Sequence, residues 1–174
     1  VRAPVLAVVG TVLAVSGPVL VAWLARLLPE LAADPIGALF VDMPYPAVQW
    51  TGFLLVGLAF GRGRPSERTL PAIGVLGLIL GVGLHLAAID VQERLLTDPS
   101  GIDGLVLERF ADDHRSQNPL EAASVLAIAI AVLALLWVVT PRLGRLLYPL
   151  EAAGRMALTL YVAHVVAYWL AIET

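Results

Sequence analysis

Long uncharged stretches separated by short polar connections dominate the pattern of hydrophobic and polar positions along this chain. Each stretch is close to the ~20 residues that a helix needs to cross a hydrocarbon core of ~30 Å. The pattern therefore predicts an all-α, polytopic transmembrane helical bundle that forms a single domain with about five spanning helices. The predicted spans are residues 3–25, 43–61, 69–89, 122–140 and 156–172.

The longest connection, residues 90–119, is acidic but also contains hydrophobic residues at helical spacing. Ile102, Leu105, Val106 and Phe110 recur at intervals of three or four residues along part of this loop. Such spacing is typical of an amphipathic helix. We expect a short interfacial helix here, lying on the membrane surface or folding back over the bundle.

Composition supports a membrane protein and excludes several kinds of chemistry. Of the 174 residues, 59% are hydrophobic and only 14% are charged, whereas a soluble domain has about 25% charged residues. The chain has no cysteine, which excludes disulfides, thiolate catalysis and cysteine metal sites. The formal net charge is −3. We therefore expect the lipid bilayer as a partner, with no metal site and no nucleic acid.

Positive charge is concentrated in alternate connections, which predicts the orientation in the membrane. Arginines fill residues 62–68 and 141–155, whereas loop 90–119 is mainly acidic. Because positive residues in short loops stay cytoplasmic, we expect the first two segments inside and the acidic loop outside a bacterial cytoplasmic membrane. The chain also opens on Val1 rather than methionine, so we expect it to be the C-terminal part of a longer protein.

Glycines recur at helical spacing in the second and third predicted spans. Gly57 and Gly61 form a G-x-x-x-G pair, and Gly74, Gly77, Gly81 and Gly83 lie in the next span. Small residues let membrane helices approach closely. We therefore expect these faces to pack against neighbouring helices, a partner membrane protein or a second copy, with a direct ligand role as the alternative.

Three histidines and one aspartate are the candidate catalytic residues. His85 lies four residues after Gly81, so it shares the glycine face and points into the bundle. His164 lies in the last span, His114 in the outer loop, and Asp90 where that loop begins. Each histidine has two interpretations: a group hydrogen-bonded to its surroundings, or a general base oriented by a carboxylate such as Asp90.

The arginines on the predicted inner side also have two interpretations. Topology alone can account for them, or they hold the phosphates of a donor that arrives from the cytosol. No P-loop, serine-hydrolase elbow or dinucleotide-binding fingerprint is present. The candidate donor-binding residues are Arg62, Arg64, Arg142, Arg145 and Arg155.

Two segments, residues 44–62 and 149–164, resemble spans of bacterial, actinobacterial-type multi-span membrane proteins related to heparan-α-glucosaminide N-acetyltransferase. The likeness covers the C-terminal part of such a protein. Members of that group often carry a His-Ser-Gly type motif before the penultimate span. His114 and Ser116 occupy that place here, with Arg115 between them and Gln117 where glycine is expected.

The resemblance implies an acyltransferase that moves an acyl group from cytosolic acyl-CoA to a sugar or lipid outside the cytoplasm. It implies that the inner arginines bind the CoA phosphates and that His114, or else His85, deprotonates the acceptor. Two alternatives stay open: a transporter or flippase-like module, and a non-catalytic membrane subunit that packs against a partner through its glycine faces.

Overall fold

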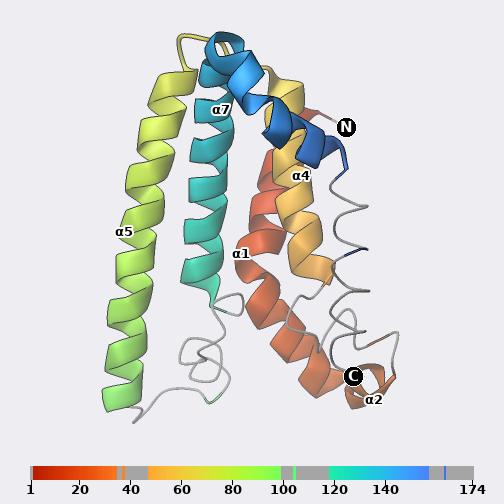
Figure 1. Ribbon diagram of the computed structural model, residues 1–174. Coiled ribbons are helices and arrows are strands. Elements are labelled where there is room, and N and C mark those ends of the chain that lie inside the picture. The colour runs from red at the N-terminus through yellow and green to blue at the C-terminus, as the bar shows by residue number, and fades with distance from the viewer. Residues whose placement is uncertain are drawn as a thin grey trace, which may run out of the picture. The chain divides into compact units, whose positions relative to one another are not determined.

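The computed structural model describes residues 2–34, 37, 47–98, 104, 118–156 and 163, and all the secondary structure in them is helical (Figure 1). The chain divides into two compact units, Val1–Leu135 and Leu136–Thr174, and each is described by itself. The helices are α1 (Ala3–Leu27), the short α2 (Pro29–Ala33), α4 (Ala47–Gly63), α5 (Leu70–Thr97) and α7 (Pro119–Arg155).

Three helical segments of the described chain are long and apolar enough to cross a membrane: Ala3–Leu27, Leu70–Thr97 and Pro119–Gly144. They bear out the prediction of a multi-pass, all-α membrane protein in contact with the lipid bilayer. Much of their surface is exposed apolar side chain, since only 11% of the most apolar window of α5 is buried. In a bilayer this surface is covered by lipid.

The prediction of five spans is wrong for the part of the chain that the structure describes. Helix α4 has 17 described residues, Ala47–Gly63, about 26 Å at 1.5 Å per residue, and it is not among the three candidate spans. The first four residues of the predicted span 43–61 lie outside the described residues. The predicted span 156–172 lies outside the described residues, apart from Met156 and Ala163.

The observed ends of α5 and α7 also differ from the ends of the predicted spans. Helix α5 continues eight residues beyond the predicted end at Ile89, to Thr97, through a polar segment supported by the Asp90–Arg94 ion pair. Helix α7 begins at Pro119 and ends at Arg155, with non-helical backbone angles at Leu143, so it comprises two helical segments joined by a kink. Of the expected interfacial helix in loop 90–119, the region around Ile102 lies outside the residues that the structure describes.

Helices α1 and α4 pack closely at two glycines. A Cβ added to Gly10 would lie 2.8 Å from the carbonyl oxygen of Gly52, and one added to Gly52 would meet the backbone of Ala14. By contrast, no described atom lies within 4 Å of a Cβ added to Gly57 or Gly61. Among the described residues, the expected contact is therefore made at Gly52 and not at the G-x-x-x-G pair.

Helices α5 and α7 lie side by side along the glycine face of α5 (Figure 1). A Cβ on Gly77 would lie 2.9 Å from the carbonyl oxygen of Ala127, and one on Gly81 would lie 2.5 Å from Cγ1 of Ile128. The hydroxyl of Ser124 donates a 2.8 Å hydrogen bond to the carbonyl oxygen of Gly81. The prediction that the glycines of the third span form a packing face is confirmed for Gly77 and Gly81, whereas no described atom lies within 4 Å of a Cβ added to Gly83.

A small buried cluster connects α7 with the α1–α4 pair. Ala14 of α1, Val56 of α4 and Leu126 of α7 form its centre, with Phe53 and Ile130 packed against them. Helix α7 therefore uses two faces, one of small residues against α5 and one of larger aliphatic residues against α1 and α4. This arrangement fixes which face of α7 is directed toward α5, and with it the position of the candidate site.

The α1–α4 contact yields a test with a matched control on the same helix. We expect Gly52→Ala to lower the free energy of unfolding in detergent by about 1–3 kcal/mol, since the added methyl group overpacks the contact. Gly57→Ala has open space, and removing a glycine from a helix interior stabilises it by roughly 0.5–1 kcal/mol. Thermal unfolding of the two variants measures this; equal stabilities would contradict the packing described here.

Candidate functional site: a histidine–glutamate pair between two membrane helices

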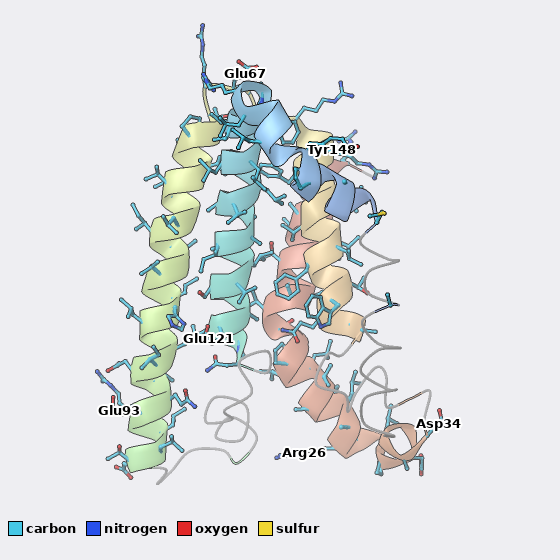
Figure 2. All side chains as sticks on the ribbon, in the orientation of Figure 1. Arg26, Asp34, Glu67, Glu93, Glu121 and Tyr148 are labelled. Atoms are coloured by element: carbon cyan, nitrogen blue, oxygen red, sulfur yellow. The ribbon has the colours of Figure 1, made fainter. Side chains whose placement is uncertain are left out.

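His85 lies one helical turn beyond the close contact at Gly81 and faces α7. Its Nδ1 atom is 2.7 Å from Oε1 of Glu121, a contact that joins positions 36 residues apart in the chain. Figure 2 labels Glu121 on α7 where that helix lies next to α5. The prediction that the glycine face directs His85 into the bundle is confirmed. Its partner, however, is a carboxylate that the sequence patterns did not single out.

Glu121 is held in place by the start of α7. The side-chain Oδ1 of Asn118 accepts hydrogen bonds from the backbone N–H groups of Leu120 (2.9 Å) and Glu121 (3.5 Å). This is the usual role of an N-cap asparagine, and Pro119 suits the first helical position, where no N–H is needed. A carboxylate in the first turn of a helix is also stabilised by the helix dipole. The local sequence therefore fixes the position of Glu121 in the first turn of α7.

The pair is partly shielded on one side and open on the other. The side chain of His85 is 38% exposed and that of Glu121 only 12%. An ionised carboxylate can only accept hydrogen bonds. With Glu121 ionised, Nδ1 must therefore carry the proton and donate it to Oε1, which leaves Nε2 as the acceptor nitrogen. Among the described residues, none makes a hydrogen bond with Nε2. This arrangement orients a neutral imidazole whose Nε2 can accept a proton.

Asp90, the carboxylate expected to orient a histidine, lies elsewhere. Its Oδ2 atom is 2.9 Å from Nε of Arg94, one turn along the same helix, and both side chains are largely exposed. Five residues separate Asp90 from His85, so the two side chains leave α5 on different faces. The structure brings His85 together with Glu121 and not with Asp90. His114 and His164 lie outside the described residues.

Of the candidate donor-binding arginines, Arg62 and Arg64 precede the opposite end of α5 from His85. Arg62 is in the last turn of α4 and exposed Arg64 follows that helix, with a left-handed backbone (φ 45°) that non-glycine residues rarely adopt. His85 lies 15 residues into α5 from Leu70, about 22 Å by helical rise. In the second unit, exposed Arg142 donates a 2.9 Å hydrogen bond to the carbonyl oxygen of Val138.

The remaining candidate arginines are Arg145 and Arg155, and the sequence also predicted no metal site. The backbones of Arg145 and Arg155 are helical, but their side chains lie outside the described part of the structure. Within that part, no group of three or more His, Asp or Glu side chains could hold a metal ion. The His85–Glu121 pair joins the side chains of two candidate membrane spans.

Sequence reasoning missed Glu121 because it lies one residue before the predicted start of the fourth span at Ala122. A signal for it does exist: asparagine, proline and glutamate at positions 118, 119 and 121. This combination is typical of the first turn of a helix, with an N-cap, a proline at N1 and an acid at N3. Reading this signal would have moved the helix start to Pro119 and placed Glu121 on α7.

Comparison with known proteins identifies the family. A family model described as a protein of unknown function (DUF418) matches residues 57–171. The chain belongs to the DUF418 family. The matched DUF418 region includes all of α5 and α7, and therefore both His85 and Glu121, whereas α1 precedes it. No curated protein and no solved structure matches the chain. Membership confirms a membrane-protein family; the relationship to acetyltransferases stays a prediction.

The contact in this DUF418 protein can be measured by a double-mutant cycle. We expect His85→Ala and Glu121→Ala to show a coupling of about 1–2 kcal/mol in unfolding free energy, because either change leaves a partly buried polar group without its partner. Asp90→Ala with Arg94→Ala is the control. As an exposed pair one turn apart, it should couple by only about 0.3–0.5 kcal/mol. Equal couplings would mean that the interhelical contact is not formed.

Proposed function

We propose that this protein is a membrane-embedded acyltransferase in which His85, oriented by Glu121, acts as the general base toward the acceptor. The observation that supports this most directly is the 2.7 Å contact between Nδ1 and Oε1 across two membrane helices. A histidine held by a carboxylate in one tautomer is a common general base near neutral pH. Ionisable side chains inside membrane spans are costly and usually functional.

The proposed reaction transfers an acyl group from a thioester to a hydroxyl or amine. Nε2 of His85 takes the proton of the acceptor while the acceptor's oxygen or nitrogen attacks the thioester carbonyl. The new ester or amide bond forms, the carbon–sulfur bond breaks, and the departing thiolate recovers the proton from Nε2 as a free thiol. Glu121 keeps Nδ1 protonated throughout and stabilises the imidazolium that forms between the two steps.

The proposed topology places the two substrates at opposite ends of the bundle. Segments 62–68 and 141–155, rich in arginine, would face the cytoplasm, and loop 90–119 would lie outside the bacterial membrane. The pair of His85 and Glu121 is close to the outer end of α5. An acyl-CoA held by Arg62 and Arg64 would then have to present its thioester about 22 Å along the bundle from those arginines.

A proton-dependent transporter is the second candidate, and the same contact favours it. Transporters use ionisable groups within their spans, and Glu121 belongs to the candidate span Pro119–Gly144. A histidine and a glutamate that connect two membrane helices can bind and release a proton. Measurements in proteoliposomes separate the two: transport requires a pH gradient and no acyl-CoA, whereas acyl transfer consumes acyl-CoA without a gradient.

A proposal about protein partners rests on two exposed glycines of α4. Gly57 and Gly61 lie on a surface with no described atom near them, and both are exposed. A small-residue face of this kind suits close approach by another membrane helix. We therefore retain a partner protein or a second copy of the chain as an assembly proposal. Cross-linking through Gly57→Cys in native membranes tests it, because the chain has no other cysteine.

The catalytic proposal predicts graded losses of acyl transfer. His85→Ala should lower kcat by about 10²–10⁴-fold, the usual contribution of a general base. Glu121→Gln should lower it less and shift the pH–rate profile, since the amide still contacts Nδ1 but no longer stabilises the imidazolium. Initial rates with radiolabelled acetyl-CoA across a pH series measure both effects.

The matched control for the glutamate is Glu30→Gln, an exposed acid on α2, which should leave the rate unchanged. His114→Ala tests the other candidate base. Full activity in His85→Ala together with its loss in His114→Ala would assign the base to the outer loop and exclude the role proposed for His85.

Donor binding predicts a separate effect on KM. Arg62→Gln and Arg64→Gly should each raise the KM for acyl-CoA by about tenfold, equivalent to one charged contact with a phosphate, with kcat largely kept. In Arg64→Gly, glycine also relieves the left-handed backbone, so thermal stability should rise while donor affinity falls. A KM unchanged in both variants would leave topology as the explanation of these arginines.

A further inference from the structure

We infer that the acceptor of this site is a hydroxyl-bearing membrane lipid, which reaches His85 sideways from the bilayer along the contact between α5 and α7. The inference rests on the proposed acyl transfer and names its substrate class. It follows from the position of the His85–Glu121 pair near one end of an exposed apolar surface formed by both helices.

The surface in question, called here the apolar flank, consists of Leu78, Val82 and Ile89 on α5 with Val125 and Val132 on α7. Each of these side chains is between 46% and 53% exposed. On α5, Leu78 lies seven residues before His85, Val82 three residues before it and Ile89 four residues after it. All three therefore share the side of α5 on which His85 lies. Val125 and Val132 follow Glu121 by four and eleven residues and share its side of α7.

The close approach of the two helices gives the flank its form. At Gly77 and Gly81 the backbones of α5 and α7 come so near that a single added methyl group would collide with Ala127 or Ile128. Larger side chains then stand out on either side of this contact. The flank runs from the polar pair for about 10 Å along α5 to Leu78 and about 16 Å along α7 to Val132.

The chemistry of the flank suits a lipid rather than a sugar. Between Leu78 and Ile89 on this side of α5, and between Val125 and Val132 on this side of α7, His85 is the single polar side chain of the described residues. A free sugar needs several hydrogen-bonding groups around it, since each buried hydroxyl without a partner costs free energy. A lipid needs polar contact only at its head group, and its chains can pack on Leu78, Val82 and Val132.

Membrane insertion supplies the occupant directly. Both helices are candidate spans, so the flank faces hydrocarbon and lipid chains already cover it. A lipid lying there has its head group near the outer end of α5, at the level of His85, without leaving the bilayer. An uncharged hydroxyl fits best, because Glu121, the nearby carboxylate, is already engaged by Nδ1 of His85.

The test uses the full chain in vesicles of total bacterial lipid extract with radiolabelled acetyl-CoA added. The label is then divided between the organic and aqueous phases, and dibutyrylglycerol and glucosamine serve as water-soluble acceptors. The flank variant is Val82→Phe combined with Val125→Phe, which fills the surface beside the pair. Its control is Leu76→Phe, because Leu76 is 65% exposed and lies nine residues before His85, on the opposite side of α5.

We expect label in the organic phase as an alkali-labile ester, with the flank variant lowering kcat/KM for lipid by about tenfold or more. Leu76→Phe should leave that value unchanged, and the flank variant should keep the rate with dibutyrylglycerol. Transfer to glucosamine in preference to lipid, or equal effects of the flank variant and Leu76→Phe, would overturn the lipid inference and leave acyl transfer standing. If no acceptor receives label while pH-driven transport is observed, the acyltransferase proposal and the lipid inference fail together.

Discussion

The close approach of α5 to α7 is the constraint on which the site depends. Lipid chains are as apolar as leucine, so membrane helices gain little by burying apolar surface and are held by close packing and a few polar bonds. Here the packing comes from Gly77 and Gly81 against Ala127 and Ile128, and the bond from Ser124 to the carbonyl oxygen of Gly81. Only because the backbones are this near can His85, one turn further along, touch a side chain on the next helix.

The start of α7 holds the carboxylate of Glu121 at the edge of a membrane. A buried charge is costly unless it is paired and hydrogen-bonded. The carboxylate of Glu121 gains the helix dipole and the ring of His85. Asn118 accepts hydrogen bonds from the backbone N–H groups at the start of α7 and thereby fixes the position of Glu121. The same contacts of Glu121 therefore contribute both to the stability of the structure and to the proposed chemistry.

Local patterns predicted the helical class and the face of His85, but not its partner. Hydrophobic runs and the glycines of α5 depend on neighbours a few residues away, and both were predictable from sequence. The partner of His85 lies 36 residues away in the chain and on another helix. Which residue it is depends on how the two helices are aligned, and the periodicity of the sequence does not encode that alignment. The same reason explains why Gly57 and Gly61 were expected at a contact that Gly52 makes instead: spacing marks a small-residue face, and packing selects which one is used.

The length of α5 has a consequence for where this protein can work. Its apolar part, from Leu70 to Ile89, is roughly 28 Å long, and the charged turns that follow must stay in water. His85 therefore lies only about 6 Å below the level at which hydrocarbon gives way to head groups. Membranes of different organelles and organisms differ in thickness by a few Å, and proteins adjust by tilting or by deforming the bilayer. Bilayer thickness thus decides whether the imidazole of His85 contacts water or hydrocarbon, and so which molecules can reach it.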